Sequence, residues 1–110
     1  MSNPVLFTKG KALRDLLIRS HLSVNAKITD VVDTPAELGS ALVVSASSEG
    51  GYEAIIAPAN EANGILLETA HDSSKEVLVL IHGEIKSSFY DTQLSQELRI
   101  DLLKNGIVLK

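Results

Sequence analysis

Residues 77–81 read Val-Leu-Val-Leu-Ile, and His82, Gly83 and Glu84 follow them directly. Five consecutive apolar residues, two of them valine and one isoleucine, are typical of a β-strand that is covered on both faces. Strands of this kind occur in small barrels and sandwiches. The segment is therefore the strongest core candidate in the chain, and a mainly β domain is expected to form around it.

Shorter strand signals lie on both sides of this segment. Apolar and polar residues alternate strictly over 21–29, which predicts a half-buried strand. Its apolar face carries Leu22, Val24, Ala26 and Ile28. Residues 41–44 and 52–57 predict two more strands, and the small, polar connection between them resembles a hairpin tip. Residues 65–67, after an Asn-Gly turn, and residues 107–109 complete the expected strands.

A helix is predicted over residues 92–104. Asp91 and Thr92 offer side-chain oxygens for an N-cap, and Gly106 follows Lys104 where a left-handed C-cap belongs. Apolar residues repeat at helical spacing between these ends. They are Leu94, Leu98 and Leu102, with Leu103 beside them. The expected architecture is mainly β, a small barrel or sandwich, with one helix in its C-terminal half.

The front of the chain is expected to be an arm over residues 1–10, because this segment shows no periodicity. The remaining residues, 11–110, are predicted to form a single domain, since 110 residues are too few for two independent cores. Within that domain, residues 11–19 place apolar side chains at helical spacing. This favours a second, short N-terminal helix, although nine residues need tertiary support to stay helical.

The composition excludes several classes of protein. The chain has no cysteine, which removes disulfides, thiolate catalysis and zinc sites built on sulfur. A net charge of −4 disfavours nucleic acid as the main partner. No apolar run reaches the ~18 residues of a membrane span, and the start lacks a signal-peptide pattern, so synthesis and retention in a cytoplasm are expected.

Charge is distributed unevenly along the chain. Residues 1–35 carry five basic and three acidic side chains, whereas residues 36–110 carry five basic and eleven acidic ones. A basic front on an acidic body suits docking against an acidic partner. An ordinary solvated surface explains the same pattern equally well.

His82 and Glu84 are the candidates for acid–base catalysis. Two residues apart on a strand, they share one face, where the carboxylate would orient the imidazole. No nucleophile or metal ligand is placed beside them, so the end of a strand is the simpler interpretation of His82. Glu68 and His71 have metal-ligand spacing only on a helix, and this stretch is predicted as strand and turn. No cofactor or metal is expected.

Three segments together resemble a known family. Residues 62–67 match a pattern A-x-G-I-L, residues 77–85 match V-L-V-x-G-E-V, and residues 97–110 contain L-R and then G-I-x-L. In this order they resemble the head decoration proteins of tailed bacteriophages, the family that includes the lambda decoration protein. Residues 38–43 resemble a further strand of that family more loosely, and residues 1–35 match no motif.

The resemblance implies a mainly β fold of the β-tulip type and a structural role without enzymatic activity. Such proteins form homotrimers at local three-fold positions on the exterior of the expanded capsid, and they hold neighbouring subunits of the major capsid protein together. It implies a virion protein made in the cytoplasm of a bacterial host. It implies neither nucleic acid, membrane nor small-molecule substrate as a direct partner.

In this family an N-terminal arm commonly becomes ordered on binding and adds to the sheet of the shell. The apolar residues of the arm are therefore the expected capsid contacts: Pro4, Val5, Leu6 and Phe7. The helical spacing over 11–19 departs from this pattern. Two other functions remain open, a trimeric adaptor or base of a head or tail fibre, and a small enzyme that uses His82 and Glu84.

Overall fold

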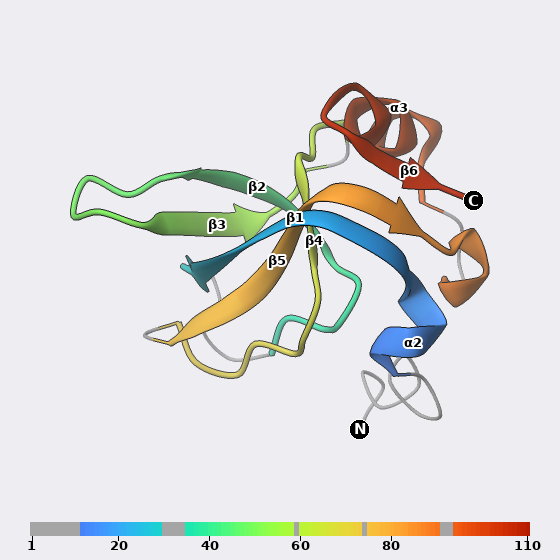
Figure 1. Ribbon diagram of the computed structural model, residues 1–110. Helices are drawn as coiled ribbons and strands as arrows, with labels where there is room; N and C mark the ends of the chain where they lie inside the picture. The colour runs from blue at the N-terminus through green and yellow to red at the C-terminus, as the bar shows by residue number, and fades with distance from the viewer. Residues whose placement is uncertain (1–11, 30–34, 59, 74, 91–93) are drawn as a thin grey trace.

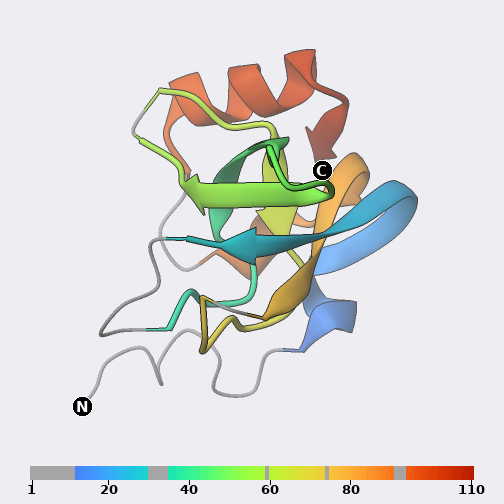
Figure 2. The ribbon, with the colours of Figure 1, turned by 90° about the vertical axis from the view of Figure 1, so that its left-hand side faces the viewer.

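The computed structural model describes residues 12–29, 35–58, 60–73, 75–90 and 94–110. It is a mainly β domain with a helix near the C-terminus, as predicted (Figure 1). In chain order the elements are α2 (Leu13–Leu16), β1 (Leu17–Ile28), β2 (Ala41–Ala46), β3 (Tyr52–Ile56), β4 (Gly64–Leu66), β5 (Glu76–Ile85), the 3-10 helix η1 (Ser87–Phe89), α3 (Gln96–Lys104) and β6 (Ile107–Leu109). Helices α2 and α3 lie at opposite ends of the molecule (Figures 1 and 2).

The sheet closes on itself as a small barrel. Its strand order is β1-β3-β2-β4-β5, and β5 pairs back to β1. The β1–β3 pair is parallel, and the other four pairs around the barrel are antiparallel. Strand β6 lies outside this ring, parallel to the last residues of β5. Closure leaves few unpaired strand edges, which suits a small domain without disulfides.

Strand β5 is the centre of the fold, as its apolar run predicts. Its first half lies between β1 and β4, and its second half lies between β1 and β6. Val79 and Leu80 are neighbours in sequence and both are fully buried. A strand that is covered on both faces is therefore confirmed, and it extends beyond residue 81 to Ile85.

Two clusters of buried side chains lie on the two faces of β5. The cluster inside the barrel includes Ala26, Ile28, Leu42, Ala54, Leu66 and Val79. The cluster between the outside of the barrel and the helices includes Leu16, Ile65, Leu80, Ile85, Leu102 and Ile107. Each fully buried Leu or Ile stabilises the fold by about 1.5–3 kcal/mol. An aliphatic core of this size matches the low aromatic content of the sequence.

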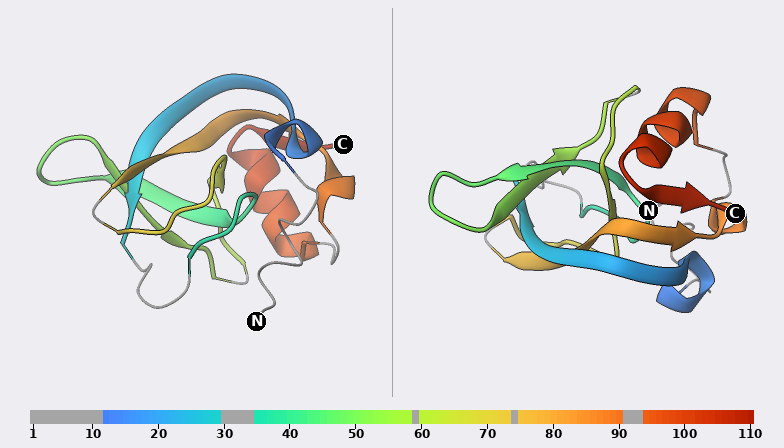
Figure 3. Two further views of the ribbon diagram at one scale, coloured as in Figure 1. Left: turned by 90° about the horizontal axis from the view of Figure 1, so that it is seen from below. Right: turned by 45° about the horizontal axis from the view of Figure 1, so that its top comes forward.

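The β1–β5 ladder contains bulges that bend it. Ser20 pairs with Gly83, the next paired residue, Leu22, pairs with His82, and Ser23 then pairs with Leu80. The ladder thus skips His21 on β1 and Ile81 on β5. Such bulges bend and twist a strand pair, and both strands curve strongly together (Figure 3). Because the bulge shifts the alternation of β5, Leu80 and Ile85 face the same cluster although they are five residues apart.

The β2–β3 hairpin agrees with the sequence prediction. Ala46 pairs with Tyr52, and the turn between them contains Gly50 and Gly51, both with positive φ. The hairpin projects from the barrel (Figures 1 and 3). The strand predicted over 21–29 is the second half of β1, which ends one residue earlier, at Ile28. Ala26 and Ile28 are buried, but Leu22 at the bend is 46% exposed.

The prediction for residues 11–19 is wrong in its extent. Helix α2 is a single turn, closed by the Asp15 carboxylate, which accepts a hydrogen bond from the Ala12 amide over 2.6 Å. Leu17 is already extended and pairs with Ile85. Pairing with β5 thus overrides the helical spacing in this stretch. The expected arm over residues 1–10 lies outside the described residues.

The predicted start of the C-terminal helix is also wrong. Helix α3 begins at Gln96, and Ser95 is its N-cap, accepting a hydrogen bond from the Leu98 amide over 3.2 Å. Asp91 and Thr92 lie outside the described residues. The other end is confirmed, because Lys104 is the last helical residue and Gly106 has a φ of 99°.

Candidate functional site

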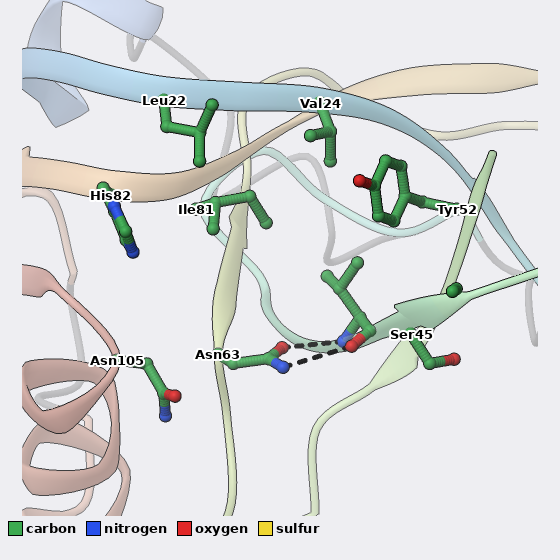
Figure 4. A pocket seen from close by; sticks show the side chains of 10 residues that line it. Leu22, Val24, Ser45, Tyr52, Asn63, Ile81, His82 and Asn105 are labelled. Carbon is green, nitrogen blue, oxygen red and sulfur yellow. Dashed lines mark hydrogen bonds between the residues drawn. The ribbon is translucent and has the colours of Figure 1, made fainter.

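A hollow opens where the bent β1–β5 ladder, the β2–β3 hairpin and the end of α3 meet (Figure 4). Its volume is about 280 Å³, and we name it the mouth pocket. The residues that line it are Leu22, Val24, Val44, Ser45, Ala46, Tyr52, Asn63, Ile81, His82 and Asn105. Four strands and two loops therefore contribute to one concave surface.

The floor of the mouth pocket is apolar. Val24, Val44 and Ile81 are half-buried and pack on the cluster inside the barrel. Leu22 and Tyr52 stand higher on its walls and are 46% and 45% exposed. Large apolar side chains that remain this accessible around a hollow commonly mark a binding surface.

Asn63 fixes one wall by acting as a substitute for a strand residue. Its Oδ1 accepts a hydrogen bond from the Val44 amide over 2.7 Å, and its Nδ2 donates to the Val44 carbonyl over 3.1 Å. The pairing of β2 with β4 involves only Ala41 and Leu42. The Asn63 side chain thus continues that pairing by one position, and β2 beyond it borders the mouth pocket.

His82 and Asn105 form the end of the mouth pocket near α3. The imidazole of His82 lies against Gly106, where a Cβ would come within 2.6 Å of its Cδ2. The Asn105 Nδ2 donates to the carbonyl of Asp101 over 2.8 Å and to that of Ala62 over 3.3 Å. Asp101 in turn accepts a hydrogen bond from the Ala62 amide over 2.7 Å. These contacts tie the end of α3 to the loop before β4.

His82 and Glu84, the predicted acid–base pair, lie in two different environments. His82 lies inside β5 and lines the mouth pocket, rather than ending the strand. Glu84 is half-buried, and its Oε1 lies 3.3 Å from Nζ of Lys110. Glu84 is not among the residues that line the mouth pocket. Its carboxylate instead forms an ion pair with Lys110, the residue directly after β6.

The remaining candidates from the sequence have structural roles or lie outside the described ranges. The Glu68 carboxylate accepts a hydrogen bond from the Leu78 amide over 2.7 Å. Within the part of the chain that the structure describes, no three His, Asp or Glu side chains are placed to hold a metal ion. Pro4, Val5, Leu6 and Phe7 all fall in the undescribed first residues. None of the described helices is long and apolar enough to span a membrane.

Sequence patterns did not predict the mouth pocket. Strict alternation placed Leu22 and Val24 in the core, and nothing singled out Tyr52 or Asn105. One signal was available: Gly83 directly after an apolar run, because a glycine inside a strand often marks a bulge or a close backbone approach. The bulge at Ile81 is the device that brings Ile81 and His82, neighbours in sequence, to the same surface.

Comparisons of the chain with protein-family models, with curated proteins and with solved structures find no match.

Proposed function

We propose that this chain is a structural protein of a bacteriophage head, which binds the exterior of the expanded capsid as a homotrimer and holds neighbouring capsid subunits together. The observation that carries the proposal is the ordered set of three motifs over residues 62–67, 77–85 and 97–110, which resemble those of head decoration proteins. These segments contain β4, β5, and α3 with β6, respectively.

The three motifs form one structural unit in this chain, which supports the proposal. Ile65 of β4 pairs with Leu80 of β5, and Gly83 of β5 pairs with Ile107 of β6. Side chains from all three segments meet in the cluster under α3. Short apolar motifs recur by chance in many β proteins, whereas an ordered set that forms adjacent strands with a common core is a more specific pattern.

The described surface also suits a protein that works by contact with other chains. Several large apolar side chains are exposed: Leu13, Ile18, Leu22, Tyr52, Ile55, Ile56, Ile100 and Leu103. Leu103 and Ile100, at 58% and 45% exposure, border a second hollow with Val108 and Leu109 of β6. A trimer that makes three such contacts at once gains avidity from contacts that are weak singly.

The proposed partner is the major capsid protein, and the proposed contacts are Pro4, Val5, Leu6 and Phe7 of the arm. An extended apolar segment can add to the edge of a sheet, where main-chain hydrogen bonds provide affinity. The basic residues that follow the arm would favour an acidic capsid surface.

The test measures mass and shell binding. Light scattering gives the mass of the purified chain in solution and on shells of the phage that encodes it, and sedimentation gives its binding to expanded and unexpanded shells. The proposal expects saturable binding to expanded shells in multiples of three copies, and weaker binding to unexpanded ones. A monomer that ignores expanded shells would overturn it. Labelling restricted to the neck or tail of intact particles would favour the adaptor or fibre base instead.

A further inference from the structure

We propose that the mouth pocket binds an extended segment of another polypeptide, which inserts one uncharged, aliphatic or aromatic side chain between Leu22, Tyr52 and Ile81. This proposal goes beyond the capsid role, and it holds whether or not the chain is a decoration protein.

Size and shape favour a side chain over a free small molecule. Pockets that enclose drug-sized ligands measure roughly 300–1,000 Å³ and bury most of the ligand surface. The mouth pocket, at about 280 Å³, lies at the lower limit of this range. Its rim residues Leu22 and Tyr52 are each nearly half exposed, so the hollow is open to solvent and an occupant would stay partly exposed. One large apolar side chain fits these conditions.

Charge restricts the occupant further. None of the ten residues that line the mouth pocket is Lys, Arg, Asp or Glu. A carboxylate or ammonium group that entered would lose hydration without meeting an opposite charge, which is costly. An aliphatic or aromatic group would instead gain by leaving water, at roughly 25 cal/mol per Å² of buried surface. The segment that binds is therefore uncharged at the position that enters.

The edge of β2 offers main-chain hydrogen bonds beside the mouth pocket. The carbonyls of Ser40 and Leu42 accept hydrogen bonds from the β4 side. On the same side, the amide and carbonyl of Val44 are hydrogen-bonded to the Asn63 side chain. Because strand residues alternate, the amide and carbonyl of Ala46 face the same side. Among the described residues, Ala46 lies beyond the last partner on this edge. An extended segment can pair with it, as in strand addition to a sheet edge.

A side chain at the rim can bind the rest of such a segment. The His82 imidazole points into the mouth pocket from β5 (Figure 4). Its ring nitrogens can bind a backbone amide or carbonyl. Polar groups at the rim around an apolar floor form the arrangement found at protein interfaces.

The test titrates the isotope-labelled full chain, followed by NMR, with blocked amino acids of the form N-acetyl-X-methylamide. The probes carry Leu, Phe, Ser, Glu or Lys at X, and methyl glucoside serves as a neutral small molecule. We expect the Leu and Phe probes to shift the Leu22, Val24 and His82 side-chain resonances saturably, with millimolar affinity. The Ser, Glu and Lys probes should shift them at least about tenfold more weakly.

Two variants locate the binding, with a matched control. Leu22→Ser removes an apolar wall, and Ala46→Glu places a carboxylate at the exposed edge of β2. Each is expected to weaken binding of the Leu probe at least about fivefold, whereas Leu103→Ser on α3 should leave it unchanged. Amide spectra confirm that each variant is folded.

Three outcomes would overturn the proposal. They are the absence of saturable shifts with every probe, equal shifts with charged and apolar probes, and a preference for methyl glucoside, which would indicate a small-molecule site. Shell binding is measured separately, so the failure of either proposal leaves the other standing.

Discussion

At the residue scale, Gly83 shows how a missing side chain permits the close crossing of β1 and β5. A Cβ at this position would collide with the carbonyl oxygen of Arg19 and come within 3.0 Å of Cδ1 of Leu80. The clash involves backbone, which cannot rotate away as a flexible side chain can. Gly83 is required by space alone, since its φ is not in the left-handed region.

Gly83→Ala is therefore expected to lower the free energy of unfolding by about 2–4 kcal/mol, measured by urea denaturation. Gly50→Ala is the control: no other group lies within 4 Å of the position that its Cβ would take, and only its φ of 94° opposes a side chain. That strain should cost about 1 kcal/mol. Equal losses in the two variants would contradict the steric explanation.

Tyr90 couples stability to alkaline pH. Its hydroxyl donates to the Gly39 carbonyl over 2.8 Å, and its ring meets Phe89 edge to face. Burial raises the pKa of the Tyr90 phenol well above its usual range. The unfolded phenol ionises near pH ~10. The native state therefore holds this proton where the unfolded state has lost it, so this contribution to stability is full below pH ~10 and is lost as the pH rises further.

Tyr90→Phe tests this coupling. The variant should lose about 1 kcal/mol at neutral pH with the hydrogen bond, measured by thermal or urea unfolding. Between about pH 9 and 11, roughly one unit either side of the pKa of a free phenol, it should lose less stability than the parent chain. An identical alkaline decline in both proteins would show that other groups cause it.

At the element scale, a strand, turn or helix end is predictable from the sequence where its local residue pattern agrees with the tertiary contacts that those residues make. The apolar run of β5 is buried on both faces, the glycines at residues 50 and 51 form the hairpin turn, and Gly106 ends α3. In each case the residues that form the sequence pattern have the burial or the backbone conformation that the pattern predicts. Strand β6 was predictable for the same reason.

The errors arise where distant partners decide the structure. Residues 11–19 have helical spacing, yet from Leu17 onward they pair with β5, which lies far along the chain. The bulges at His21 and Ile81 also depend on that pairing, so strict alternation wrongly placed Leu22 in the core. The mouth pocket combines residues from four strands and two loops, and no local pattern contains that information.

Ser95 tests the corrected start of α3. Its hydroxyl satisfies one of the amides that the first turn of a helix leaves without an internal partner. Ser95→Ala should lower the free energy of unfolding by about 1 kcal/mol, measured by urea denaturation. Ser88→Ala, at an exposed position in η1, is the control and should change stability by less than about 0.5 kcal/mol. No loss at Ser95 would argue against this N-cap.

At the scale of the whole molecule, the described residues form a closed barrel with its own two core clusters. Deleting residues 1–10 is therefore expected to leave thermal stability nearly unchanged while it weakens binding to expanded shells. Calorimetry and sedimentation with shells measure the two effects. A large fall in Tm would instead show that Val5, Leu6 and Phe7 belong to the core.

The closure of the barrel also determines the order in which the chain can fold. Strand β1 pairs along its length with β5, and Leu17 meets Ile85. During synthesis at roughly 5–20 residues per second, β1 leaves the ribosome several seconds before its partner exists. Only residues 26–28 of β1 can pair earlier, with β3. A ladder between segments as distant as β1 and β5 forms slowly. The barrel therefore closes only after β5 has been synthesised, and until then most of β1 is exposed to aggregation in the nascent chain.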